Sequence, residues 1–72
     1  MITAEQLDNW FTYHAPTGQP QVDAYQRIRE AGKALATAIV ESSPASADQT
    51  AAVRHVREAV MTANAAIACG GK

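Results

Sequence analysis

Two long stretches of the chain place core-type residues at alternating spacings of three and four, which is the spacing of one face of an α-helix. The first stretch carries this seam at Tyr25, Ile28, Gly32, Leu35 and Ile39. The second stretch carries it at Val53, Val56, Val60, Ala63 and Ile67. Because Pro44 and its serine neighbours separate the two stretches, the pattern predicts an antiparallel αα-hairpin with a short loop.

Turn and capping residues set the expected limits of the helices. Residues 3–6 and 46–49 are spaced as capping boxes, and Pro20 suits the first turn of a helix. We expect a single domain over residues 1–72 with helices at about 4–11, 20–42 and 47–68. The expected fold class is all-α, in which a short N-terminal helix precedes a long antiparallel αα-hairpin.

A hairpin of this composition has little to bury on its own. Sixteen of the 72 residues are alanine, which forms helices well but removes little apolar area from water. Natural domains this short usually add disulfides, a metal ion or further subunits. Cys69 has no second cysteine to pair with, and two histidines with one thiol form no zinc pattern. We therefore expect a homo-oligomer without metal or cofactor.

The charge balance limits the partners. Six basic and seven acidic residues give a formal net charge of −1, whereas a protein that coats duplex nucleic acid needs an excess of Lys and Arg. A small anionic ligand needs only two or three well-placed cations. No apolar run approaches the roughly 18 residues of a membrane span, and the start MITAEQ lacks signal-peptide features. We expect a cytoplasmic protein without a membrane partner.

Signatures of catalysis are missing from the sequence. There is no G-x-S-x-G nucleophile motif, no phosphate-binding glycine loop and no H-E-x-x-H zinc motif. Cys69 lies near a chain end that we expect to be frayed, far in sequence from both histidines. We therefore expect a binding protein and no catalytic residues.

The stretch NWFTYHAP contains three of the four aromatic residues. In one interpretation Leu7, Trp10 and Phe11 share a helix face and fold the short helix over the open end of the hairpin. In the other, the rings form a stacking surface for a flat ligand. Tyr13 and His14 lie beyond the expected helix end, where a half-exposed ring can stack on a base.

Two rows of polar residues border the seam. The row on the first long helix consists of Tyr25, Arg29 and Lys33. The row on the second consists of Arg57, Met61 and Asn64. Both rows lie at similar heights in an antiparallel hairpin, but the sequence does not fix how they face each other. They are either ordinary solvated surface or an anion site, because the arginine fork matches phosphate. Asn64 needs a hydrogen-bond partner in its apolar surroundings.

The segments FTYHAPT, YQRIREAGKALA and PASADQTAAVRHVREAVMTANAAIA resemble small phage proteins with an Acb/Tad-type helical-hairpin domain, the anti-CBASS and anti-Thoeris sponges. The resemblance runs from about Gln6 to Ala68. It implies a non-enzymatic protein that sequesters cyclic nucleotide immune messengers in the host cytoplasm and so blocks antiphage signalling. Such proteins bind cyclic dinucleotides, cyclic trinucleotides or cyclic ADP-ribose isomers. They form homo-oligomers, typically hexamers built as trimers of dimers, with ligand between subunits.

The resemblance also assigns residues. The family's ligand-facing aromatic falls on Tyr13, and its basic phosphate contact falls on Arg29. With the residues singled out above, the candidate ligand-binding set is Phe11, Tyr13, His14, Arg29, Arg57 and Asn64. Longer anti-Thoeris relatives carry a domain before the hairpin, and some short members carry an arginine near Ala65. These departures favour cyclic dinucleotides among the ligands. The alternative function is a phage helical oligomer that acts as a protein–protein interaction module.

Overall fold

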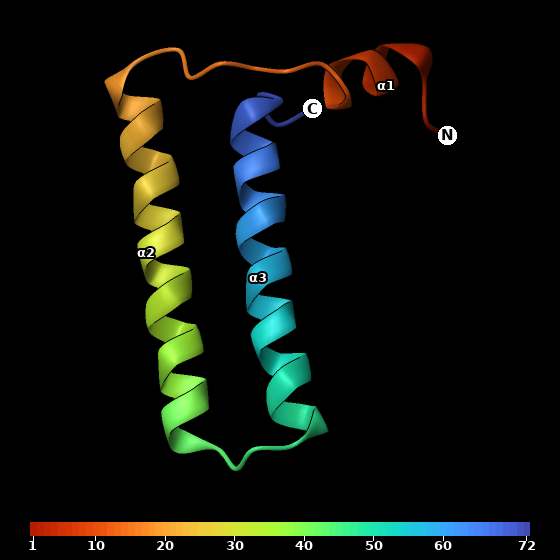
Figure 1. Cartoon of the computed structure of the whole chain (residues 1–72). Coiled ribbons are helices and arrows are strands. Elements are labelled where there is room, and N and C mark those ends of the chain that lie inside the picture. The colour runs from red at the N-terminus through yellow and green to blue at the C-terminus, as the bar shows by residue number, and fades with distance from the viewer.

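The computed structural model describes all 72 residues, Met1–Lys72, as three helices without strands. Helix α1 spans Ala4–Trp10, α2 spans Gln19–Ser42 and α3 spans Ala47–Ala68. Helices α2 and α3 lie side by side and antiparallel, and residues 43–46 join them (Figure 1). The all-α fold class with a helical hairpin, predicted from the sequence, is confirmed. No helix combines the length and the apolarity that a membrane crossing requires.

Of the two predicted capping boxes, the structure forms the first completely and the second only in half. Thr3 and Gln6 exchange the two hydrogen bonds of the first box. At the second, the Ser46 hydroxyl accepts the Gln49 backbone N–H at 3.2 Å, but the Gln49 side chain does not return the bond. Its Nε2 donates instead to the Ser43 carbonyl at 2.9 Å. The last carbonyls of a helix lack partners within the helix. By donating to the carbonyl at the end of α2, Gln49 from the start of α3 ties the two ends of the hairpin loop together.

The two long helices pack along the predicted seam with one exchange. Ala36 is half-buried and takes the seam position that was expected for Leu35. Leu35 itself is 55% exposed. The helices approach closely at Gly32, which lies against Val60. The space one turn further along admits the methyl group of alanine, so the larger leucine turns outward. The seam expected on α3 is half-buried throughout, at Val53, Val56, Val60, Ala63 and Ile67.

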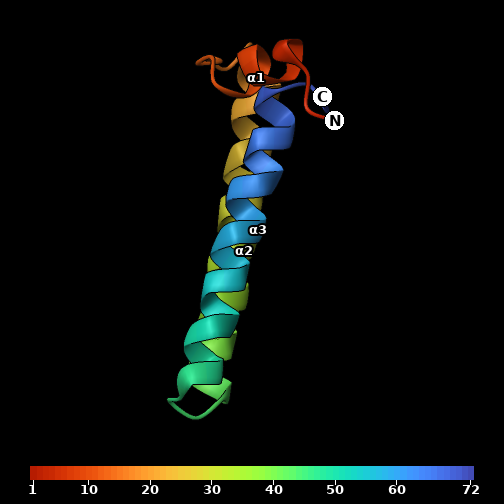
Figure 2. The same ribbon diagram turned by 90° about the vertical axis from the view of Figure 1, so that its right-hand side faces the viewer.

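The chain is a slab one helix thick, as the edge-on view shows (Figure 2). Its principal extents are 44 × 33 × 15 Å, and no residue falls in the buried class. The radius of gyration is 15.2 Å, whereas a compact domain of this length has about 11 Å. The accessible surface is 5745 Å², against about 4300 Å² for a globular monomer of this mass. A single copy therefore leaves both faces of its hairpin uncovered.

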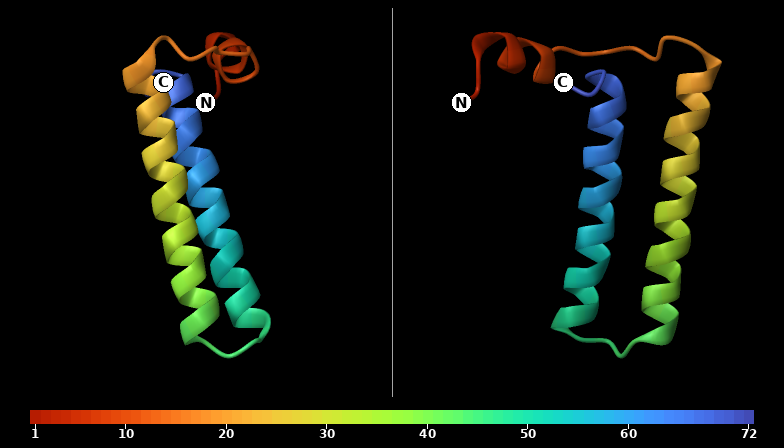
Figure 3. Two further views of the ribbon diagram at one scale, coloured as in Figure 1. Left: turned by 60° about the vertical axis from the view of Figure 1, so that its left-hand side comes forward. Right: turned by 180° about the vertical axis from the view of Figure 1, so that it is seen from behind.

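Helix α1 does not cover the open end of the hairpin. It lies beyond the end of α3, on the side away from α2, and residues 11–18 cross the open end instead (Figures 1 and 3). Phe11 is 84% exposed, so the interpretation of this helix as an apolar plug is wrong. The reason is local, because side chains of Asn9 and Trp10 hydrogen bond to the last carbonyls of the chain and hold α1 beside α3.

Candidate functional site

The seam between α2 and α3 opens as a shallow groove on each face of the slab. Both grooves share the same floor, made by Gly32, Val56 and Val60. Because the floor is common, any difference between the two grooves comes from the side chains along their rims. The rims differ in charge.

One groove, here termed the cationic groove, has a basic side chain on each rim. Lys33 from α2 and Arg57 from α3 line a space of about 230 Å³ together with Ala36, Val53 and Met61. The structure thus answers what the sequence left open, since the two polar rows face the same side. Arg29 precedes Lys33 by one helical turn and so projects from the same side of α2. It is not among the side chains that line the groove.

The cations of this groove have no acidic partner within the chain. The one contact between a basic and an acidic side chain joins His55 and Glu58 at 3.8 Å, and neither Lys33 nor Arg57 takes part in it. Two unpaired cations beside an apolar floor attract an anion, and an arginine offers a planar fork that fits phosphate oxygens. The groove therefore has the chemistry to bind a phosphate-bearing ligand with an apolar or aromatic part.

Asn64 adds an unsatisfied acceptor near this groove. It follows Met61 by three residues, so it lies on the same side of α3 one turn closer to the open end. Its Oδ1 is buried and has no hydrogen-bond partner. A buried carbonyl oxygen without a partner is destabilising by about 1–3 kcal/mol. A donor from a ligand or a second subunit would remove that cost.

The opposite groove, here termed the alanine groove, carries no carboxylate, lysine or arginine. Its space of about 500 Å³ is lined, besides the shared floor, by Ile28, Ala31, Leu35, His55, Ala59 and Ala63. Small side chains let another helix approach closely, and Leu35 projects among them. This face has the composition of a contact between helices.

The loop over the open end presents its rings to solvent. Tyr13 is 85% exposed, and Phe11 is nearly as exposed. His14 is half-buried, and its Nε2 lies 2.7 Å from the Asn9 carbonyl oxygen. Since a carbonyl only accepts, Nε2 carries the proton and donates. This bond fixes the loop next to Tyr13 while leaving the tyrosine ring free.

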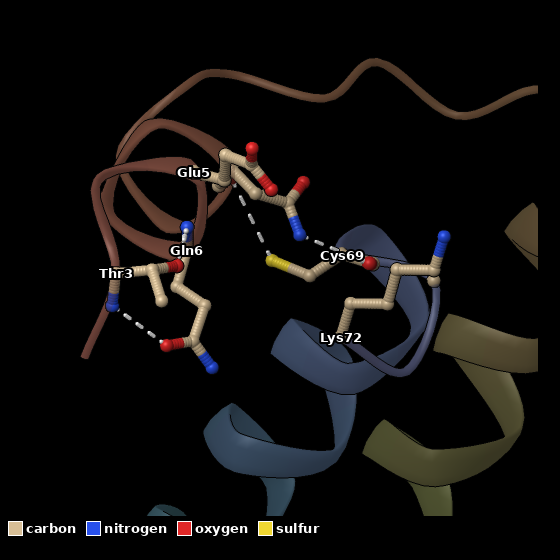
Figure 4. A pocket seen from close by; sticks show the side chains of 7 residues that line it. Thr3, Glu5, Gln6, Cys69 and Lys72 are labelled. Carbon is tan, nitrogen blue, oxygen red and sulfur yellow. Dashed lines mark hydrogen bonds between the residues drawn. The ribbon is translucent and has the colours of Figure 1, made fainter. Parts of the chain in front are cut away.

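Asn9 connects this loop to the end of α3. Its Nδ2 donates to the Cys69 carbonyl at 3.2 Å, and its own carbonyl also receives the Cys69 thiol at 3.8 Å. Trp10 donates its indole N–H to the Lys72 carbonyl at 3.3 Å. Figure 4 shows the half-buried Cys69 directed at α1, so the expectation of a frayed end is wrong. No local sequence signal predicts these bonds, because sixty or more positions separate the partners.

A protein-family model described as "Acb2/Tad1, hairpin domain" matches residues 3–68. The chain belongs to the Acb2/Tad1 hairpin-domain family. The resemblance found in the sequence is thereby confirmed, and the match takes in all three helices. The family is one of phage sponges for cyclic nucleotides, a binding domain and not an enzyme. No curated protein and no solved structure matches the chain.

A single copy of this chain does not bring all six candidate residues to one place. Phe11, Tyr13 and His14 lie in or beside the loop over the open end. Arg29 lies ten residues after the start of α2, which is roughly 15 Å along the helix axis. Arg57 lies at the cationic groove, still further from the loop. Within one copy, the aromatic groups of the loop and the basic groups of the hairpin therefore lie at different heights along the molecule.

Proposed function

We propose that this chain is a non-enzymatic sponge that binds cyclic dinucleotides between subunits of a homo-oligomer. In this proposal it withdraws the messenger in the host cytoplasm and so blocks antiphage signalling. The observation that carries it is the pair of cations, Lys33 and Arg57, which flank an apolar groove without a carboxylate to neutralise them. Membership of a family of cyclic nucleotide sponges supports the same conclusion.

The proposed ligand matches the groups along this face. A cyclic dinucleotide has two phosphates and two flat bases related by a two-fold axis, and a two-fold dimer presents every residue twice. Arg29 and Arg57 donate to phosphate oxygens. The bases stack on Tyr13, with Phe11 and His14 beside it, at about 1–3 kcal/mol per base. The Oδ1 of Asn64 accepts from a base amine or a ribose hydroxyl.

The assembly follows from the uncovered hairpin. A chain with no buried residue and an excess of exposed surface gains stability mainly by packing on other copies. The alanine groove is the face proposed for this packing, since no lysine, arginine or carboxylate that would have to be desolvated lines it. We propose a hexamer built as a trimer of dimers, with the cationic grooves left to the ligand.

The second candidate function is a helical oligomer that docks on a host protein. The alanine groove favours it, because the same mainly apolar face that is proposed to accept a second copy also fits a partner helix. This function makes no use of the unpaired cations. The two candidates therefore differ in what the cationic groove binds.

Calorimetric titration of the purified protein tests the proposal directly. The panel consists of cyclic di-GMP, the 3′,3′ and 2′,3′ isomers of cyclic GMP-AMP, cyclic tri-AMP and cyclic ADP-ribose isomers. Each sample is then denatured and its nucleotide analysed by HPLC. Submicromolar binding with intact nucleotide returned is the expected result, and the stoichiometry gives the number of subunits per ligand.

Matched arginine variants assign the binding to the proposed face. Arg29→Ala removes a cation on the side of the cationic groove. Arg27→Ala removes a cation two residues earlier, on a different side of the helix. Only the first is expected to weaken binding. An absence of binding across the panel contradicts the sponge function and favours the protein-docking alternative.

A further inference from the structure

We propose that Gly32 is a specificity-determining residue, because its missing side chain sets the distance between α2 and α3 at the cationic groove. That distance decides which anions Lys33 and Arg57 can hold together. The proposal rests on the sponge function above and adds the structural element that selects among ligands.

The contact at Gly32 is the closest approach of a glycine to a side chain in the molecule. A β-carbon built at Gly32 would overlap the Cγ2 methyl group of Val60. The next atoms, Val56 Cγ1 and Val60 Cβ, would lie at 3.8 and 3.9 Å, which are ordinary contact distances. Val60 is β-branched, and one side-chain rotamer dominates for valine in a helix. A methyl group at residue 32 therefore has to push the two helices apart.

This separation acts on the ligand-facing rims. Gly32 and Val60 lie in the floor of the cationic groove, Lys33 is the neighbour of Gly32, and Arg57 is three residues from Val60. Because the helices are continuous over this region, spreading them at Gly32 moves the two cations apart. Glycine forms helices poorly, so its place in the interior of a 24-residue helix has a packing reason.

A second substitution can compensate for the methyl group added at residue 32. Val60→Ala removes the Cγ2 atom that the new methyl group would overlap, and the remaining neighbours are at ordinary distances. The double variant Gly32→Ala/Val60→Ala therefore transfers methyl volume from α3 to α2 and keeps the helix spacing. Val60→Ala alone leaves the spacing unchanged and opens a small gap.

The test compares the wild type with Gly32→Ala, Val60→Ala and the double variant on the panel named above. Gly32→Ala is expected to lower the affinity for the nucleotide that the wild type binds most tightly by roughly tenfold or more, as for one misaligned charge-assisted hydrogen bond. The affinity for the larger cyclic nucleotides of the panel is expected to fall less than the affinity for the smaller ones. The double variant is expected to regain most of the affinity that Gly32→Ala loses and to restore the wild type's order of preference, and Val60→Ala alone shows what the valine methyl groups of the floor contribute.

Two results overturn the proposal. In one, Gly32→Ala assembles and binds every nucleotide like the wild type. In the other, the double variant binds as weakly as Gly32→Ala although circular dichroism shows the same helix content. If the wild type itself binds nothing, the sponge function fails and the selectivity role fails with it. Thermal unfolding of the four proteins then still shows whether Val60→Ala relieves the overlap at Gly32.

Discussion

The cationic groove and the alanine groove are two sides of one seam, yet they have different chemistry. Both rest on Gly32, Val56 and Val60. Only the first has Lys33 and Arg57 on its rims, whereas the second is bordered by apolar side chains, most of them small, and by His55. A rim without lysine, arginine or carboxylate lets another helix exclude water from the groove at little cost in desolvation, whereas a cationic rim favours an anion.

In the proposed function, this difference lets a thin hairpin combine assembly with ligand binding. A core formed between copies needs no bulky side chains within the chain, so alanine is sufficient on both helices. The charges are then kept on the face that the core does not use. Each of the following variants tests one side of this division.

The largest effect is expected for Leu35→Glu. The carboxylate would lie on the alanine groove, where packing of a second copy would have to desolvate it, so we expect the assembly to dissociate. The loss is on the order of 3 kcal/mol per subunit, which lowers the unfolding midpoint by about 15 °C. Light scattering coupled to gel filtration, with circular dichroism melts, measures both.

Val40→Glu is the matched control for this variant. Val40 lies on the same helix and is equally exposed at 55%, but its position five residues on turns it to a different side of the helix. We expect it to keep the assembly. Dissociation of Val40→Glu with an intact Leu35→Glu would reverse the assignment of the two faces.

Arg57→Ala is expected to act on the other face. It removes one of the two rim cations and its phosphate contact, which contributes about 1.5–3 kcal/mol, or roughly ten- to a hundredfold in affinity. The assembly should remain, since the alanine groove is untouched. Calorimetry with the tightest panel nucleotide measures the loss. Unchanged affinity would show that the ligand does not use the cationic groove.

A smaller effect is expected for Tyr13→Ala. The ring is exposed in the single chain, so its removal should leave stability unchanged while affinity falls by about tenfold through lost stacking. Tyr13→Phe keeps the ring and should bind nearly as the wild type does. A fall in the unfolding midpoint of Tyr13→Ala without a fall in affinity would instead make Tyr13 an assembly residue.

The smallest effect is expected for Asn64→Ala, and it has opposite signs in the two states. Without ligand, removal of the unpartnered buried Oδ1 should stabilise the protein by about 1 kcal/mol. With ligand, affinity should fall about fivefold, as for one lost neutral hydrogen bond. Melts with and without nucleotide show both changes. Thr62→Ala, an exposed change on the same helix, should move neither value.

The helices were predictable because their signals are local. The repeat of apolar residues and the capping residue Thr3 act within a few positions of each other, and all three predicted segments are helical. Leu35 shows where this reasoning ends. Its place in the seam depends on how near α3 comes at Gly32, which is a property of two helices and not of one.

The site required information that no single segment holds. Lys33 and Arg57 face the same groove because of the rotation of each helix about its axis, which packing of the whole hairpin determines. The position of α1 depends on Asn9 reaching a carbonyl sixty residues away. A local pattern carries no record of such contacts. The spacing of Trp10 and Phe11 therefore predicts an apolar plug, although the contacts with the end of α3 hold the helix elsewhere.

The bond from the Trp10 indole to the Lys72 carbonyl gives the molecule a built-in optical reporter. Trp10 is the one tryptophan of the chain, so its fluorescence comes entirely from the contact between α1 and the end of α3. Circular dichroism comes mainly from the long hairpin. Unfolding followed by both signals will show whether the aromatic loop detaches before the hairpin melts, and nucleotide titrations can be followed without a dye.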